Sequence, residues 1–216
     1  MLRLPSLRRF LLPRIHIGGY ARPQGGLWQL VTLYWFNRYR PRWIATYGPD
    51  VAAAKWVMLN GGSVRFKYDR EYLYDIDALA EAESLEDWHH QQLEVICARN
   101  STIYSPGFKF LELCEHVKSV HLIKCLNVTD ASLKALAEYV GDNLRKLTVE
   151  WCPITDKSIP HLAQLKNLRT LTIANCPRVK NPNEALEQLR EALPNCDIKY
   201  ESSRITEEDM MAEETK

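Results

Sequence analysis

Three stretches of the chain repeat one pattern of apolar and polar positions. They are Val117–Cys125, Leu144–Cys152 and Leu168–Cys176. Each has apolar residues at its first, fourth and sixth positions and a cysteine at its ninth. Alternation of this kind predicts a strand that sends every second side chain into a core. The three strands are therefore expected to be copies of one structural unit.

The residues after these strands agree as well. "NVTDASLKALA" from Asn127 parallels "PITDKSIPHLA" from Pro153, which predicts a turn followed by a short helix. Thr129-Asp130 and Thr155-Asp156 can cap these helices, since their side-chain oxygens accept from unpaired N–H groups. The copies begin 27 and then 24 residues apart, within the period of leucine-rich repeats. "LPNCDIKY" from Leu193 fits a truncated last strand that closes the stack.

A single repeat cannot bury its own apolar face, so a short stack needs caps. The sequence predicts an α/β fold: a short leucine-rich-repeat solenoid of the cysteine-containing type over residues 111–200, with an N-terminal helical cap over residues 49–110. Within the cap, "GPDVAAAKWVMLNGG" predicts a helix closed by Gly61 and Gly62, and "SVRFKY" predicts a short strand. Residues 71–100 are charged and periodic enough to predict helix.

Residues 27–48 are aromatic and basic, and their apolar run is too short to cross a bilayer. An interfacial helix on an anionic membrane surface is one interpretation of this segment. Packing of the same aromatics on the folded body is the alternative. The membrane-contact candidates are Trp28, Val31, Trp35, Arg38, Arg40 and Arg42.

The charge is uneven along the chain. No acidic residue precedes Asp50, whereas residues 1–49 contain eight arginines and no lysine. Residues 1–26 are therefore predicted to be a mitochondrial transit peptide, with a basic tail that binds polyanions as the alternative. Residues 201–216 are predicted to be a disordered acidic tail.

The cysteines are not expected to form a disulfide framework, because no secretory apolar core is present. Cys125, Cys152 and Cys176 stand where the chain leaves each strand, and a small, poorly solvated side chain suits an inward turn there. Their predicted role is structural. His121 lies at an outward position, so it is not expected to pair with the inward thiol of Cys125. No phosphate-binding loop, HExxH, GxSxG or CxxC pattern occurs, and no enzyme is predicted.

The outward strand positions form one continuous surface in a stack of repeats. Their mixture of charge and small size fits a protein partner and not nucleic acid, which calls for clustered basic and stacking residues. A solvated face without a partner is the alternative. The partner-binding candidates are Ser119, His121, Ile123, Lys146, Thr148, Glu150, Thr170, Thr172 and Ala174.

The chain resembles the mitochondrial ATP synthase subunit s (coupling factor B) family and its relative, distal membrane arm assembly component 2 of complex I. The resemblance runs from about Phe36 to Ile198 and includes "GPDVAAAKW", "GGSVRF" and "CEHVKSVHLIKC". "GPDVAAAKW" followed by "GGSVRF" favours the subunit s branch, whereas "GDNLRKLTVEWCP" and "LPNC" are equally similar to the complex I branch.

This resemblance implies a non-catalytic, peripheral protein on the matrix side of the mitochondrial inner membrane. It would regulate ATP synthase coupling and proton conduction through protein contacts. The sister branch implies instead an assembly factor for the distal membrane arm of complex I, which would bind assembly intermediates. A cytosolic ubiquitin-ligase substrate adaptor is a further alternative, because cysteine-type repeats are common in that class.

The resemblance also implies a divalent cation such as Mg²⁺, held partly by backbone carbonyls. The matching positions are Gly61, which keeps the family's glycine, and Arg99, where the family has threonine. A second departure concerns thiols: where the family can have two cysteines separated by one residue, this chain has Ile123-Lys124-Cys125. The paired-thiol role is therefore not expected here.

Overall fold

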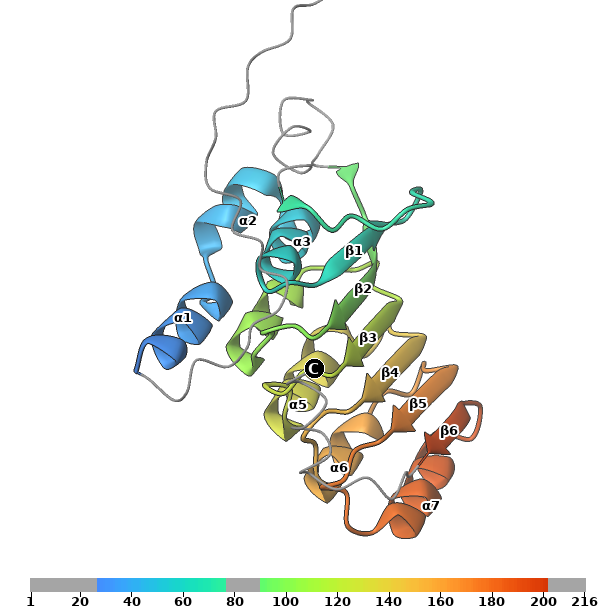
Figure 1. The fold of residues 1–216 in the computed structure, drawn as a ribbon. Coiled ribbons are helices and arrows are strands. Elements are labelled where there is room, and N and C mark those ends of the chain that lie inside the picture. The colour runs from blue at the N-terminus through green and yellow to red at the C-terminus, as the bar shows by residue number, and fades with distance from the viewer. Residues whose placement is uncertain (1–26, 77–89, 202–216) are drawn as a thin grey trace, which may run out of the picture.

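The computed structural model describes residues 27–76 and 90–201. These residues form a mixed α/β fold around a six-stranded sheet whose strands follow one another in chain order (Figure 1). Strand β1 is antiparallel to β2, and each later pair of neighbours is parallel. The strands are β1 (Ser63–Phe66), β2 (Leu93–Arg99), β3 (Ser119–Ile123), β4 (Lys146–Glu150), β5 (Thr170–Ala174) and β6 (Asp197–Glu201).

Helices connect the parallel strands and lie along one side of the sheet (Figure 1). This arrangement is what parallel neighbours require, because each strand must return to the same end before the next begins. The α-helices are α1 (Leu27–Asn37), α2 (Pro41–Tyr47), α3 (Pro49–Leu59), α5 (Asp130–Val140), α6 (Ile159–Leu162) and α7 (Pro182–Ala192). The 3-10 helices are η2 (Ser105–Leu111) and η3 (Asp156–Ser158).

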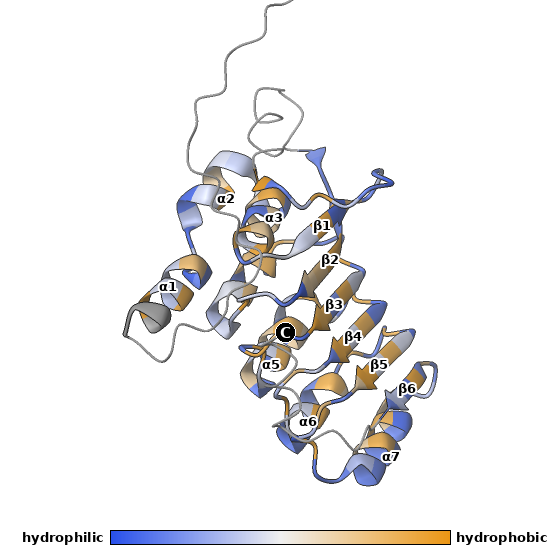
Figure 2. Cartoon of the chain, viewed as in Figure 1, coloured by the Kyte–Doolittle hydropathy of each residue, from blue (hydrophilic) through white to orange (hydrophobic). Residues whose placement is uncertain are grey.

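The core follows from the strand register. Val120, Leu147 and Leu171 pair across β3, β4 and β5, and each is at most 1% exposed. Leu122, Val149 and Ile173 form a second buried row of the same kind. Full burial of one such aliphatic side chain contributes about 1.5–3 kcal/mol. The predicted alternation in the three copies is confirmed, and Figure 2 shows the hydrophobic colour running through these strands.

A fourth copy of the strand pattern precedes the other three. The segment Leu93–Ser101 has buried Leu93, Ile96 and Ala98 at the first, fourth and sixth positions and buried Ser101 at the ninth. The prediction of helix is therefore wrong for residues 93–99, which form β2. The reason is that β2 lies between β1 and β3, where its buried side chains outweigh the local helical periodicity.

Each strand from β2 to β5 is followed by a residue with a left-handed backbone. Asn100, Lys124, Trp151 and Asn175 have φ values of 51°, 54°, 53° and 54°. The N–H of each donates to the last carbonyl of the next strand, for example Asn100 to Ile123 and Lys124 to Glu150. Asparagine adopts this conformation readily, whereas lysine and tryptophan do so less often. The repeated turn thus lets the sheet ladder continue one residue past each strand.

The Thr-Asp pairs connect consecutive units. Thr155 accepts from the Lys157 N–H and so caps η3, as predicted. The carboxylate of Asp130, however, accepts from both the N–H and the hydroxyl of Thr155 in the next unit. Asp156 likewise accepts from two backbone N–H groups, those of Lys180 and Asn181. The aspartates therefore join one unit to the next.

The N-terminal cap agrees with the sequence over α3 and β1. Gly61 has φ +81°, and Gly62 donates to the Val57 carbonyl, which closes α3 as predicted. Trp56 is 1% exposed and packs against Phe108 and Phe110 of η2. Several predictions fall outside the described residues: the leader at 1–26, the helix at 77–89 and the tail beyond Glu201, which itself ends β6.

Candidate functional site

The nine outward strand positions form three rows across β3, β4 and β5. Their register pairs Ser119 with Lys146 and Thr170, then His121 with Thr148 and Thr172, and finally Ile123 with Glu150 and Ala174. Exposure varies within this set: Lys146 is exposed, whereas Ile123, Thr148 and Ala174 are 8%, 7% and 4% exposed. The sheet brings the predicted partner-binding residues onto one face, which we call the outer face.

Hydrogen bonds fix the side chain of His121 in the middle row of the outer face. Its Nε2 lies 3.0 Å from the Ser119 hydroxyl oxygen, and its Nδ1 lies 3.0 Å from that of Thr148. Partial burial lowers the pKa of His121, and the nearby positive charge of Lys146 lowers it further. The neutral imidazole is therefore favoured, and its ring orientation is set by the two hydroxyl groups.

The outer face extends beyond the residues that the sequence pattern indicated. On β2, Cys97 pairs with His121 and Arg99 pairs with Ile123. On β6, Lys199 pairs with Thr172 and Glu201 pairs with Ala174. The β2 residues were missed because Ser101 stands where the other copies have cysteine; the apolar spacing of Leu93–Ser101 was the available signal.

The three repeat cysteines are buried and point into the core, at 0%, 0% and 6% exposure for Cys125, Cys152 and Cys176. Each thiol donates to a backbone carbonyl on the strand of the preceding unit. The distances are 3.2 Å from Cys125 to Ala98, 3.6 Å from Cys152 to Leu122 and 3.8 Å from Cys176 to Val149. Burial raises the pKa of Cys152 well above its ordinary value and raises the pKa of Cys176 to about 11. These two thiols are thus kept protonated, which suits a structural contact.

Helix α1 is attached to the body through Asn37, which is fully buried. Its side-chain nitrogen donates to Asn60 Oδ1 and to the Leu33 and Thr102 carbonyls, at 2.9–3.0 Å. Its side-chain oxygen accepts from Trp56 Nε1 at 3.0 Å and from the Tyr104 N–H at 2.8 Å. Asn37 therefore ties the end of α1 to both α3 and the segment that follows β2.

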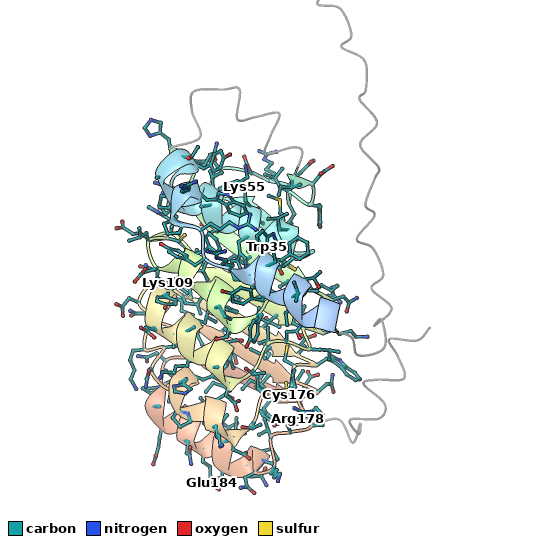
Figure 3. All side chains as sticks on the ribbon, turned by 90° about the vertical axis from the view of Figure 1, so that its left-hand side faces the viewer. Trp35, Lys55, Lys109, Cys176, Arg178 and Glu184 are labelled. Atoms are coloured by element: carbon teal, nitrogen blue, oxygen red, sulfur yellow. The ribbon has the colours of Figure 1, made fainter. Side chains whose placement is uncertain are left out.

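Part of the aromatic segment packs on the body and part is exposed. Trp43 contacts Phe110 at 5.8 Å between ring centroids, as the packing interpretation expects. Val31, Tyr34 and Trp35 of α1 are 46%, 58% and 56% exposed, as the interfacial interpretation expects. Figure 3 views the helix side of the molecule, where Trp35 lies on α1. The packing interpretation is thus confirmed for Trp43, whereas membrane contact by the exposed residues of α1 stays a prediction.

The arginines of this segment also differ. Arg38 and Arg42 are exposed. Arg40 is half-buried over the Trp43 ring, 4.5 Å from its centroid, and donates to the Trp35 carbonyl at 3.3 Å. The Trp28 side chain lies outside the described part of the chain. No helix within residues 27–76 and 90–201 is long and apolar enough to cross a membrane.

The two predicted cation ligands lie close to the paired strands β1 and β2. Ser63 begins β1 and pairs with Cys97, Gly61 lies two residues before it in the turn after α3, and Arg99 ends β2. Backbone carbonyl oxygens suit a hard cation such as Mg²⁺. The exposed Arg99 side chain, however, would place a positive charge close to a cation bound by its own carbonyl. In the described part of the chain, no three His, Cys, Asp or Glu side chains group to hold a metal. The Mg²⁺ site stays a prediction.

The fold and this face define an α/β protein built from repeated strand and helix units, with a broad outer sheet surface. No protein-family model matches the chain. ATP synthase subunit s, mitochondrial, of Homo sapiens and of Pongo abelii are each 31% identical over 171 residues, which covers 77% of this chain and 82% of the relative. The Bos taurus protein of the same name is 29% identical over the same shares. The chain belongs to the mitochondrial ATP synthase subunit s family.

Proposed function

We propose that this protein is a non-catalytic accessory protein of the mitochondrial inner membrane that regulates ATP synthase coupling and proton conduction through protein contacts. The observation that carries this proposal is the 31% identity over 82% of the length of relatives named as ATP synthase subunit s, mitochondrial. An accessory subunit acts through binding surfaces. The outer face is a rigid surface of this kind, because sheet hydrogen bonds fix every residue on it.

We further propose that the repeated units are leucine-rich repeats of the cysteine-containing type. The support is the common position of Cys125, Cys152 and Cys176. Each of these thiols donates a hydrogen bond to a backbone carbonyl on the strand of the preceding unit. Ser101 at the same place in the first unit is buried and small, which meets the same packing requirement. In such a stack each unit contacts its neighbours, so a sheet surface grows with every added unit.

In this proposal the protein is peripheral and lies on the matrix side. Exposed Val31, Tyr34 and Trp35 on α1, with Arg38 and Arg42 close behind in sequence, would contact the anionic membrane surface. The arginine-rich leader would direct the chain to mitochondria. Carbonyl groups of Gly61 and Arg99 would hold a cation such as Mg²⁺ at the start of the sheet.

The test is depletion of the protein followed by two separate measurements, ATP synthase-dependent proton flux and the amount of assembled complex I. The proposal expects altered proton flux with complex I unchanged, and restoration of the flux when the protein is supplied again. Loss of assembled complex I with normal ATP synthase coupling would contradict it and favour an assembly factor. A diffuse cytosolic signal from residues 1–49 fused to a fluorescent protein would contradict the mitochondrial location.

A further inference from the structure

The C-terminal half of the outer face carries most of its charge at two edges. Across β4, β5 and β6 the first row is Lys146, Thr170 and Asp197, and the third row is Glu150, Ala174 and Glu201. Between them lie Thr148, Thr172 and Lys199. We call the part of the outer face over β4, β5 and β6 the strip. Over β4 and β5, the middle row of the strip consists of short side chains with hydroxyl groups.

Several charges of the sheet already have partners. Arg65 and Lys118 both pair with Glu94, at 3.2 and 3.0 Å, and Lys199 lies 3.9 Å from Asp197. Three charged side chains of the strip have no such partner among the described residues. They are Lys146, Glu150 and Glu201, which make no ion pair and no side-chain hydrogen bond there. These three side chains therefore carry charges on the sheet that are available to a partner.

Their spacing follows from sheet geometry. Glu150 and Glu201 are two strands apart with Ala174 between them, so their backbones are separated by about 10 Å. Two residues seven apart on one flank of a helix are also separated by about 10 Å. Lys146 and Glu150 are at opposite ends of β4, about 13 Å apart, which leaves room for a helix about 10–12 Å wide.

We infer that the strip over β4, β5 and β6 docks a helix of the partner that carries two basic side chains seven residues apart on one flank and an acidic side chain on the other. The basic side chains meet Glu150 and Glu201, and the acidic one meets Lys146. Arg99 begins the third row on β2 and repels a basic flank, which restricts this helix to the later strands. The inference rests on the proposed function, since it describes how the outer face contacts its partner.

The first experiment measures binding of the full chain to purified, detergent-solubilised mitochondrial ATP synthase. The double variant E150K/E201K is expected to bind at least about tenfold more weakly than wild type, because both contacts become repulsive. E138K/E187K is the matched control: it changes the net charge equally on exposed positions of α5 and α7, and wild-type affinity is expected. E150Q/E201Q serves if the lysine variant fails to fold. Wild-type affinity of both outer-face variants would overturn the inference while leaving the proposed function intact.

The second experiment does not depend on ATP synthase. Its probe is an alanine-based helical peptide with two arginines seven residues apart on one flank and a glutamate on the opposite flank. Fluorescence anisotropy is expected to show at least about tenfold tighter binding than to the same peptide with all charges exchanged, and K146E is expected to reduce this preference. Equal binding of the two peptides would overturn the inference. Absence of wild-type binding to ATP synthase, with this preference intact, would contradict the proposed function alone.

Discussion

The Asp130 carboxylate accepts two hydrogen bonds of 2.7 Å from Thr155, one from its backbone N–H and one from its hydroxyl. Asp130 begins α5, whereas Thr155 precedes η3 in the next unit. A hydrogen bond to a charged acceptor contributes about 1.5–3 kcal/mol. One carboxylate thus fixes the loop of the following unit.

The first prediction follows from this contact. Replacing Asp130 by alanine is expected to lower the free energy of unfolding by about 2–3 kcal/mol, because two charge-assisted bonds are lost together. Urea denaturation measures the change. Asp142→Asn, at an exposed position, is the control and is expected to be within about 0.5 kcal/mol of wild type. A fall of less than about 0.5 kcal/mol for Asp130→Ala would show that the contact does not join the units.

The second prediction concerns Asn37. Asn37→Ala leaves the Trp56 indole N–H and the Tyr104 backbone N–H without their acceptor, and it removes three donated bonds. A buried donor left unpaired costs about 1–3 kcal/mol, so a loss of about 3 kcal/mol or more is expected. Chemical denaturation followed by tryptophan fluorescence measures it. Asn183→Ala on an exposed part of α7 is the control, and equal stability of both variants would contradict the described network.

The third prediction concerns thiol reactivity. In the folded protein, Cys152 and Cys176 are expected to stay unmodified by a thiol reagent at pH 8, while the half-buried Cys97 and Cys196 react. Mass spectrometry of the labelled peptides separates these sites, and the unfolded chain, in which all six cysteines are accessible, is the control. Rapid labelling of Cys152 in the folded protein would mean that its thiol does not face the core.

The fourth prediction is a pH dependence centred on His121. Because its pKa is lowered in the folded state, the unfolded chain binds more protons as pH falls below the ordinary value of about 6.5. The stability that the neutral ring contributes is therefore present above that pH and is lost as pH falls toward the folded-state pKa. The slope from this residue is at most about 1.4 kcal/mol per pH unit.

Urea denaturation between pH 5 and pH 7 tests this dependence. His121→Gln is expected to flatten the curve in that range, since glutamine does not titrate and can still bond to hydroxyl groups. His90→Gln, at an exposed position, is expected to leave the wild-type slope. The same slope in wild type and His121→Gln would remove His121 as its source.

Periodicity was enough to predict the repeated part of the fold. The apolar spacing around Leu147 and Val149 fixes which side chains enter the core, and this spacing depends only on the alternation of a strand. The ninth-position thiols could be assigned for the same reason. The strand Leu93–Arg99 could not be predicted in this way, because Ser101 replaces the cysteine that marks the other copies. The strand conformation of Leu93–Arg99 also depends on pairing with the neighbouring strands on both sides.

The long-range polar contacts could not be predicted from the sequence pattern. Nothing local to Asn37 indicates that its side chain meets Trp56 and Asn60, residues more than 18 positions away. The link from Asp130 to Thr155 is likewise set by the stacking of units. Arg40 could be predicted as basic and aromatic-flanked, but its position over Trp43 depends on the turn between α1 and α2.

The central claim is that this protein is an accessory protein of mitochondrial ATP synthase, and affinity purification from mitochondria tests it most directly. The tagged full chain is isolated from detergent-solubilised mitochondria, and the co-purifying complex is identified by quantitative mass spectrometry. Enrichment of ATP synthase subunits, reduced by E150K/E201K but not by E138K/E187K, is the predicted result. Enrichment of complex I assembly intermediates without ATP synthase would contradict the account.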